Sequence, residues 1–383
     1  MRTRVLATVA AIAAGLLVAT PATPVSANTA GAPKVRLLGE RIIPAGTFQG
    51  TTVGGLSGID RDPRTGGYVL ISDDRSALQP ARFYNATIDI GEHGLGEVTL
   101  TGTRPFLRPD GTPFPPLSAN GGTNAGTTVD PEDIRVDPWT GDYTWSQEGE
   151  RTLTPSQVLI DPSIQTAHRD GSFGRMLPTP PIERMSAENR GPRQNQGLEG
   201  LTFAGAGTLV VSALEGALLQ DGPEATPEHG TTSRITVQTR TGRVVAQYGY
   251  EQEPVFAQPN PPGSFSVNGV AAILAVNPLD PRRHLVMERS FVTGVGNKVR
   301  LYEIDTRGAT DIARHDSIAG EKIKPVRKKL VADLADFGLS TVDNIEGMTW
   351  GPRLRTGERT LLLVSDDNFS ATQVSQVVAL AVR

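Results

Sequence analysis

One pattern of apolar and polar positions recurs along this chain of 383 residues. Each copy opens with polar or small residues, one of them often acidic, and then enters a short apolar run. A run of about four to eight apolar residues bounded by turn residues is typical of a strand, so each copy predicts the first strand of a repeated unit. The copies occupy residues 55–59, 130–134, 197–201 and 344–348, with a weaker copy at 268–272.

A turn and further strands follow each copy. Residues 62–67 and 137–142 are closely matching turns in which proline and glycine preset the backbone angles of a hairpin connection. After the turn comes a second apolar strand that ends in acidic or polar residues, at 68–74, 143–148, 208–215, 284–289 and 361–367. A third apolar segment follows in most copies, and 233–238 alternates as a half-buried strand does.

The copies are spaced by roughly 70 residues, which suits four-stranded propeller blades with long loops. Five hairpins are clear, and segments 103–125 and 309–334 have room for a further blade. We therefore expect an all-β propeller of five or six four-stranded blades and prefer six. The alternative is a β-sandwich, whose strands lack a long-period repeat. Helical apolar spacing is found at 325–337, where we predict a short helix.

The first residues have the order of a secretory signal peptide. Arg2 and Arg4 precede an apolar run over 5–18, and small residues at 25–27 form a cleavage site. The run is shorter than the roughly 20 apolar residues of a membrane span, although an uncleaved anchor is the alternative. We expect residues 1–27 to be a signal peptide and residues 28–383 to form one secreted propeller domain without a membrane span.

Composition and the absence of known motifs exclude several classes of binding and catalysis. The 42 glycines and 29 prolines suit short strands joined by tight turns, and the lack of cysteine excludes disulfides and thiol catalysis. A net charge of −4 offers no basic footprint for nucleic acid. The sequence has no nucleophile elbow, phosphate loop or dinucleotide fingerprint, and its five histidines lack zinc-ligand spacing. We expect a monomer that acts on a small molecule.

Repeat-equivalent acidic residues are the strongest chemical signal. The first strand of each propeller blade lines the central channel, so Glu132, Glu199 and Glu346 are expected to converge. Asp133 directly follows the first of these glutamates, and Arg75 and other arginines follow the acidic strand ends. The second strands end in further equivalent acids, at Asp73, Asp74, Glu148, Glu215, Glu288, Asp366 and Asp367.

Crowded carboxylates require protons or a cation, and clusters of oxygen atoms suit Ca²⁺, which takes about six to eight oxygen ligands. We predict that Asp133 or Asp73 acts as general base and that Arg75 or Arg289 steadies an anionic group. The structural alternative is that acids at strand starts accept backbone N–H groups or brace the next blade. The predicted calcium ligands are Glu132, Glu199, Glu346 and Asp366.

The ordered series of motifs resembles the phytase-like domain family, whose members are described as having the esterase-like activity of phytase. The resemblance covers about residues 54–381, and it implies an exported β-propeller, calcium binding and hydrolysis of an ester or phosphoester. The chain departs from the β-propeller phytases because 130–134 replaces a longer acidic run and a lysine-rich phosphate pocket is missing. Calcium binding is therefore implied more directly than phytate hydrolysis. The residues that carry the resemblance are 55–60, 71–75, 132–134, 196–201, 344–348 and 364–368.

Three functions remain open from the sequence. The first is a secreted, calcium-dependent hydrolase of small-molecule esters or phosphoesters at the propeller mouth. The second is a non-catalytic propeller that binds a ligand or serves as a scaffold, because one fold hosts many functions. The third is a lactonase-type propeller enzyme, which also uses calcium at its mouth.

Overall fold

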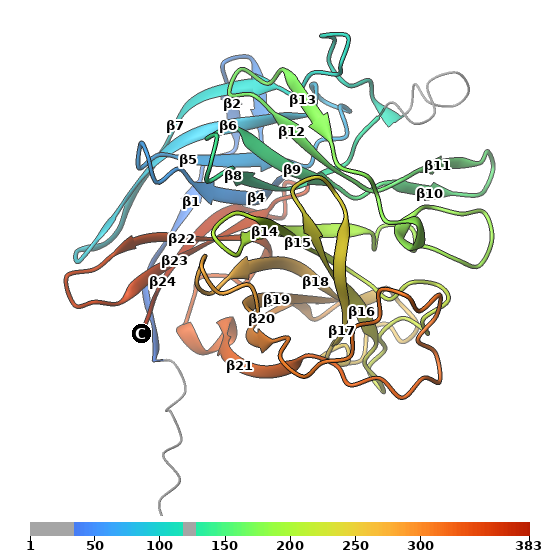
Figure 1. Cartoon of the computed structure of the whole chain (residues 1–383). Helices are drawn as coiled ribbons and strands as arrows, with labels where there is room; N and C mark the ends of the chain where they lie inside the picture. Colours follow the sequence, from blue (N-terminus) through green and yellow to red (C-terminus); the bar gives the residue numbers. More distant parts are fainter. Residues whose placement is uncertain (1–33, 118–127) are drawn as a thin grey trace, which may run out of the picture. The chain divides into compact units, whose positions relative to one another are not determined.

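Five four-stranded antiparallel sheets are arranged around a central axis in the computed structural model, which describes residues 34–117 and 128–383 (Figure 1). The prediction of an all-β propeller is confirmed. The predicted signal peptide, residues 1–27, lies outside the described residues. In the part of the chain that is described, no helix is long and apolar enough to cross a membrane.

Each blade runs from an inner strand at the axis to an outer edge strand. Blade 1 contains β4 (Leu56–Arg61), β5 (Tyr68–Ser72), β6 (Arg82–Gly91) and β7 (Gly94–Pro105). Blade 2 contains β8 (Pro131–Val136), β9 (Tyr143–Gln147), β12 (Ser163–Ala167) and β13 (Phe173–Met176). Blade 3 contains β14 (Leu198–Ala204), β15 (Leu209–Leu214), β16 (Thr232–Thr239) and β17 (Val244–Glu251).

Two more blades and two small hairpins complete the described strands. Blade 4 contains β18 (Ser266–Ala275), β19 (Arg283–Val292), β20 (Gly296–Asp305) and β21 (Arg327–Asp333). Blade 5 contains β22 (Asn344–Arg353), β23 (Arg359–Asp366), β24 (Ser375–Val382) and β1 (Val35–Ile43). The hairpins are β2 (Gly46–Phe48) with β3 (Thr51–Val53), and β10 (Glu150–Thr152) with β11 (Val158–Ile160).

Blade 5 closes the ring with both ends of the domain. Strand β1 pairs with β24 from Val35 opposite Val382 to Ile43 opposite Ser375, so an early strand is the outermost strand of the last blade. This pairing satisfies backbone groups on β24 that would otherwise form an exposed edge. Five clusters of buried apolar side chains fill the gaps between neighbouring blades, for example Met287 and Leu363 between blades 4 and 5.

The preference for six blades was wrong, because the described residues form five. Residues 327–333 supply the outer strand of blade 4, and residues 103–117 add no further sheet after β7 ends; the rest of that segment, 118–127, is not described. The predicted helix at 325–337 was also wrong. Its backbone pairs with β20 as strand β21, and only a short 3₁₀ helix, η3 (Leu334–Phe337), follows. In so short a segment, hydrogen bonding to the edge of β20 outweighs the helical spacing of the apolar residues.

The inner strand of every blade carries a β-bulge at the same repeat position. The ladder to the second strand skips one residue between Leu56 and Gly58, and equivalent shifts occur in β8, β14, β18 and β22. An extra residue bends the strand and re-aims its side chain. The skipped positions include the three glutamates of the repeat. Glycine follows two of them because the neighbouring inner strand passes close by, and a Cβ on Gly200 would lie 2.6 Å from the backbone nitrogen of Ile273.

One buried arginine joins all five blades at the axis. Arg135, on β8, is 2% exposed. Its Nε donates to the carbonyl of Leu201 at 2.6 Å, and its Nη1 donates to the carbonyls of Ile59 at 2.7 Å and Met348 at 2.9 Å. Its Nη2 lies 3.4 Å from the carbonyl of Ile273. These four carbonyls occupy equivalent positions in the other four inner strands, so a single guanidinium fixes their spacing.

Replacement of Arg135 by methionine should therefore destabilise the whole propeller. The change removes the charged partner of the buried Asp133 carboxylate and the donor to several axial carbonyls, which costs about 3–5 kcal/mol of unfolding free energy. Urea unfolding followed by circular dichroism measures this loss. Arg190→Met, at an exposed arginine without a side-chain hydrogen bond among the described residues, is the matched control. A loss below about 1 kcal/mol for Arg135→Met would contradict the axial role.

Candidate functional site

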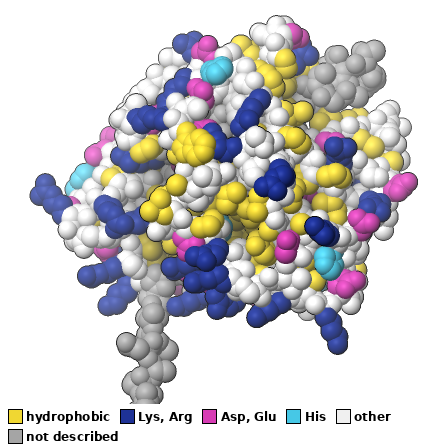
Figure 2. Space-filling model, viewed as in Figure 1, with side chains coloured by type: hydrophobic (Ala, Val, Ile, Leu, Met, Phe, Trp, Pro, Cys, Tyr) yellow, Lys and Arg dark blue, Asp and Glu magenta, His cyan; other side chains and the backbone are white. Residues whose placement is uncertain are grey.

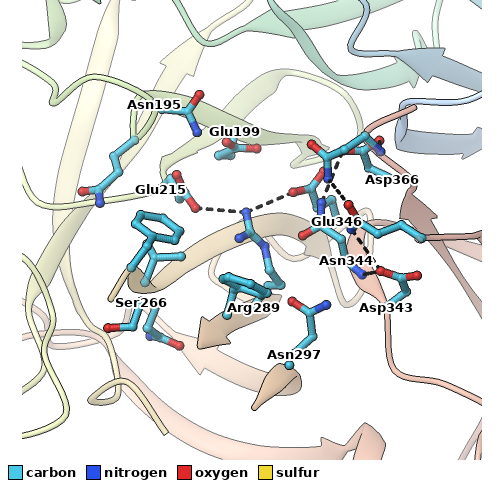
Figure 3. Close-up of a pocket in the computed structure, with 18 of the residues that line it drawn as sticks. Asn195, Glu199, Glu215, Ser266, Arg289, Asn297, Asp343, Asn344, Glu346 and Asp366 are labelled. Atoms are coloured by element: carbon cyan, nitrogen blue, oxygen red, sulfur yellow. Dashed lines mark hydrogen bonds and ion pairs between the residues drawn. The ribbon is translucent and has the colours of Figure 1, made fainter. Parts of the chain in front are cut away.

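A cavity of about 1120 Å³ opens at one end of the axis, where inner strands begin and second strands end (Figure 3). Most of its acidic residues come from the starts of β8, β14 and β22 and from the ends of the second strands. The structure thus brings together seven of the eight predicted site residues: Asp73, Arg75, Glu132, Glu199, Arg289, Glu346 and Asp366.

The three repeat glutamates reach this cavity from the bulges of their inner strands. Glu132 and Glu199 are 8% and 7% exposed, and neither carboxylate has a hydrogen bond or ion pair with another described residue. Glu346 differs because its Oε1 lies 3.0 Å from Nη2 of Arg289. Two of the three carboxylates are therefore buried at the cavity wall without a compensating partner, which a purely bracing role does not explain.

The second-strand ends add acids that the sequence prediction placed at equivalent positions but did not assign to the site. Glu148 accepts a hydrogen bond from the backbone of Gly197 at 2.8 Å, and Glu215 contacts Arg289. Their signal was the same repeat register that identified the inner glutamates. Asp130, one strand position before β8, was also missed as a site residue, although it opens the second repeat copy.

Both arginines of the cavity are engaged by acids. Arg75 Nη2 lies 2.5 Å from Asp130 Oδ2, and its Nη1 lies 3.0 Å from Glu150 Oε2. Arg289 Nη2 bridges Glu215 Oε1 at 3.3 Å and Glu346 Oε1 at 3.0 Å, as the dashed lines in Figure 3 show. The buried Nε of Arg289 has no hydrogen-bond partner among the described residues, so this guanidinium keeps one unsatisfied donor.

Two overlapping groups of carboxylates have the spacing of a metal site. Asp130, Glu132 and Glu148 form the first group, and Glu148, Glu199 and Glu215 form the second. In each group, one oxygen per residue lies within 4.8 Å of the others, and all five residues are buried. Glu148 belongs to both groups. Carboxylate oxygens without histidine or cysteine suit hard cations such as Ca²⁺, so these residues fit a divalent cation.

Burial and mutual repulsion set the protonation of these acids. Burial raises the pKa of Glu132 well above its ordinary value, and the charges of Glu199 and Asp130 raise it further. Burial likewise raises the pKa of Glu215 to about 7, although Arg289 opposes the shift.

The surface contrasts with this interior, because basic side chains are spread over the face seen in Figure 2. The overall charge of −4 hides a concentration of negative charge at the axis.

Four acids of the predicted pattern lie outside the cavity lining: Asp74, Asp133, Glu288 and Asp367. Asp133 does not line the cavity but sits deeper on the axis, where its Oδ2 accepts from Arg135 Nη2 at 2.7 Å and from the backbone of Leu201 at 2.9 Å. It replaces the repeat glycine in blade 2 and joins that blade to the next, so it lies outside the cavity in which a general base would act. Glu288 is buried beside Tyr250 and Lys328, away from the cavity.

The raised pKa values predict an unusual pH dependence of stability. A buried carboxyl with a raised folded-state pKa holds a proton that the unfolded chain has released, so stability falls as pH rises toward the folded pKa. In chelator, the melting temperature should fall by several degrees between pH 6.5 and 8.5. Ca²⁺ should raise it more at pH 8.5 than at pH 6.5, because metal ligands must be deprotonated.

Differential scanning calorimetry checks both trends. The window begins at pH 6.5 because burial lowers the pKa of His284 to about 4, and that shift opposes the trend only at lower pH. Glu215→Gln should flatten the slope in chelator. A melting temperature that rises steadily from pH 6.5 to 8.5 in chelator would contradict this electrostatic description.

No protein of curated function matches the sequence. Among solved structures, an exo-β-1,3-galactanase from Phanerochaete chrysosporium has a TM-score of 0.41 and 10% identity, over 88% of this chain and 64% of the galactanase. This chain therefore spans less than two thirds of that enzyme. An endo-arabinanase from Bacillus licheniformis has a TM-score of 0.37 and 12% identity, over 86% of this chain and 94% of the arabinanase. A gluconolactonase from Xanthomonas campestris has a TM-score of 0.32 and 11% identity, over 93% of this chain and 99% of the lactonase.

A family model gives the strongest comparison. It is described as "Phytase-like: Esterase-like activity of phytase", and it matches residues 51–369. That span begins before the first inner strand and ends just after Asp366 and Asp367, so it includes every acid of the cavity. The chain therefore belongs to the phytase-like family.

Proposed function

We propose that this protein is a hydrolase of small-molecule esters that depends on a divalent cation, with Ca²⁺ as the ion that its ligands suit best. The observation that carries the proposal is the pair of buried carboxylate groups that share Glu148. Family membership supports ester hydrolysis, because the family is described by an esterase-like activity.

The cation ligands come from both kinds of strand end. Glu132, Glu148 and Glu199 would hold the ion or ions, with Asp130 and Glu215 completing the two groups. When bound, a divalent cation polarises an ester oxygen and lowers the pKa of a water molecule at the site. Carboxylates can bind through one or both oxygens, so three of them supply much of the shell of about six to eight oxygens that Ca²⁺ takes.

The remaining polar residues suit the chemical step. Asp73 lines the cavity outside both carboxylate groups, and its side chain has no hydrogen bond or ion pair with another described residue. Burial raises its pKa well above the ordinary value, and the charges of Asp366, Asp130 and Glu346 add to the shift. A free carboxylate with a raised pKa is suited to accept a proton from attacking water.

The two arginines then take different roles. Arg289 lines the cavity and keeps one unsatisfied donor, so its guanidinium would bind the oxygen on which negative charge develops during attack. Arg75 is a positioning residue, because its contacts to Asp130 and Glu150 orient the acids of blade 2. Glu346 and Asp366, which we predicted as ligands, lie next to the Arg289 side of the cavity and would complete its charge balance.

A panel of carboxylic esters, phosphoesters and sugar lactones, assayed with chelator and then with Ca²⁺, tests this function. We expect turnover of at least one ester class to disappear in chelator and to return with Ca²⁺. Glu199→Gln should lower both Ca²⁺ affinity and kcat by at least about tenfold, because it removes a ligand charge from the second carboxylate group.

Two further variants separate binding from chemistry. Asp73→Asn should lower kcat by about 100-fold or more while Ca²⁺ affinity changes little, because the residue is a proton acceptor and not a ligand. Glu97→Gln, at an exposed position on β7, is the matched control and should change neither quantity. Full activity in excess chelator would refute cation dependence, and no turnover of any substrate would favour a ligand-binding propeller.

A further inference from the structure

The wall that blade 4 contributes to the cavity differs from the other walls. Blade 4 has Ala271 at the repeat position where blades 2, 3 and 5 have glutamate. Apart from Arg289 and Gly296, its share of the lining is formed by residues 264–268, which lead into β18, and by Phe291 and Asn297 near the β19–β20 turn. We call this set the blade-4 wall. Its side chains are uncharged, so it faces the carboxylates with hydroxyl, amide and aromatic groups.

An exposed aromatic pair forms the apolar part of the blade-4 wall. Phe265 is 66% exposed, and its ring centroid lies 6.1 Å from that of Phe291 at an interplanar angle of 34°. The backbone of Phe265 is held in place, because its carbonyl accepts from Thr293 N at 3.1 Å and from Thr293 Oγ1 at 2.7 Å. A large apolar ring exposed at the wall of a polar cavity is suited to stack against the apolar face of a ligand ring.

One polar atom beside the ring pair lacks a hydrogen-bond partner. The Oδ1 atom of Asn297 is buried and has no hydrogen-bond partner among the described residues. A buried acceptor without a donor is unfavourable, and a ligand hydroxyl group would supply the missing hydrogen bond. Eight amide side chains line the cavity as a whole, and an amide carries both a donor and an acceptor, the two groups that a hydroxyl group can pair with.

The charge of the cavity argues against a polyanionic substrate. Nine carboxyl side chains and two arginines line it, and no lysine does so among the described residues. Both arginines already contact acids. Two bound divalent cations would leave the fully ionised lining negative, so a substrate with several phosphate groups would be repelled.

We propose that the blade-4 wall binds an uncharged sugar ring, so that the substrates are esters of sugars. The C–H face of the ring stacks on Phe265 and Phe291, its hydroxyl groups bond to Asn297 and neighbouring amides, and its ester group points to the carboxylates. This inference rests on the proposed hydrolase function, since it names the substrate of that site.

Methyl glycosides provide a direct binding test because they carry no ester bond. Isothermal titration of the calcium-loaded protein with the methyl glycosides of glucose, galactose and mannose should show saturable binding of at least one. Phe265→Ala should weaken that binding about five- to tenfold, the loss expected for one stacking contact. Phe265→Trp should retain it. Leu279→Ala, at an exposed apolar residue of the β18–β19 turn, should leave it unchanged.

Kinetics separate this inference from the proposed function. Phe265→Ala should raise KM for an acetylated methyl glycoside about five- to tenfold but leave KM for ethyl acetate unchanged. Cation-dependent ester hydrolysis without binding of any methyl glycoside would overturn the sugar subsite and leave the hydrolase standing. Glycoside binding that depends on Phe265, in a protein that hydrolyses no ester, would uphold the subsite and overturn the hydrolase. Tighter binding of inositol hexakisphosphate than of every glycoside would also overturn the subsite.

Discussion

The contact of Arg135 with four neighbouring inner strands is the constraint on which the rest of this propeller depends. Its guanidinium binds equivalent carbonyls of blades 1, 3, 4 and 5, and Asp133 of its own blade balances its charge. The inner strands are therefore held in the same register along the axis. The bulged positions lie one or two residues before these carbonyls, so every blade presents its bulge at the same height. That common height is what gathers Glu132, Glu199 and Glu346 at one mouth.

The mouth holds more negative charge than its own cations balance. Arg289 bridges Glu215 and Glu346, and Arg75 contacts Asp130 and Glu150. Glu132 and Glu199 remain buried without partners among the described residues, and desolvation raises their pKa values. Buried charge of this kind reduces stability unless a proton or a metal ion compensates it. The same property that weakens the metal-free fold is the one that would bind a cation and activate water, which is a common compromise at functional sites.

The sequence predicted the propeller and the convergence of the glutamates because both follow from a repeat period. It could not predict the bulges, since no single residue marks them, and it left the blade number open because β21 pairs at an edge without an alternating pattern. Asp133 was placed beside Glu132 by adjacency alone, whereas successive strand residues point to opposite faces, and it faces Arg135. Phe265 gave no signal, because it lies in an irregular segment outside the repeat and gains meaning only from its place in the cavity.

Calcium titration of chelator-treated protein by calorimetry, with metal content checked by elemental analysis, tests the central claim most directly. The two carboxylate groups predict saturable binding of one or two ions per chain. Because Glu148 belongs to both groups, Glu148→Gln should remove most of this binding, whereas Asp130→Asn should affect the first group alone. A protein that binds no divalent cation at neutral pH, or a Glu148→Gln variant that binds as tightly as the unaltered chain, would contradict the account.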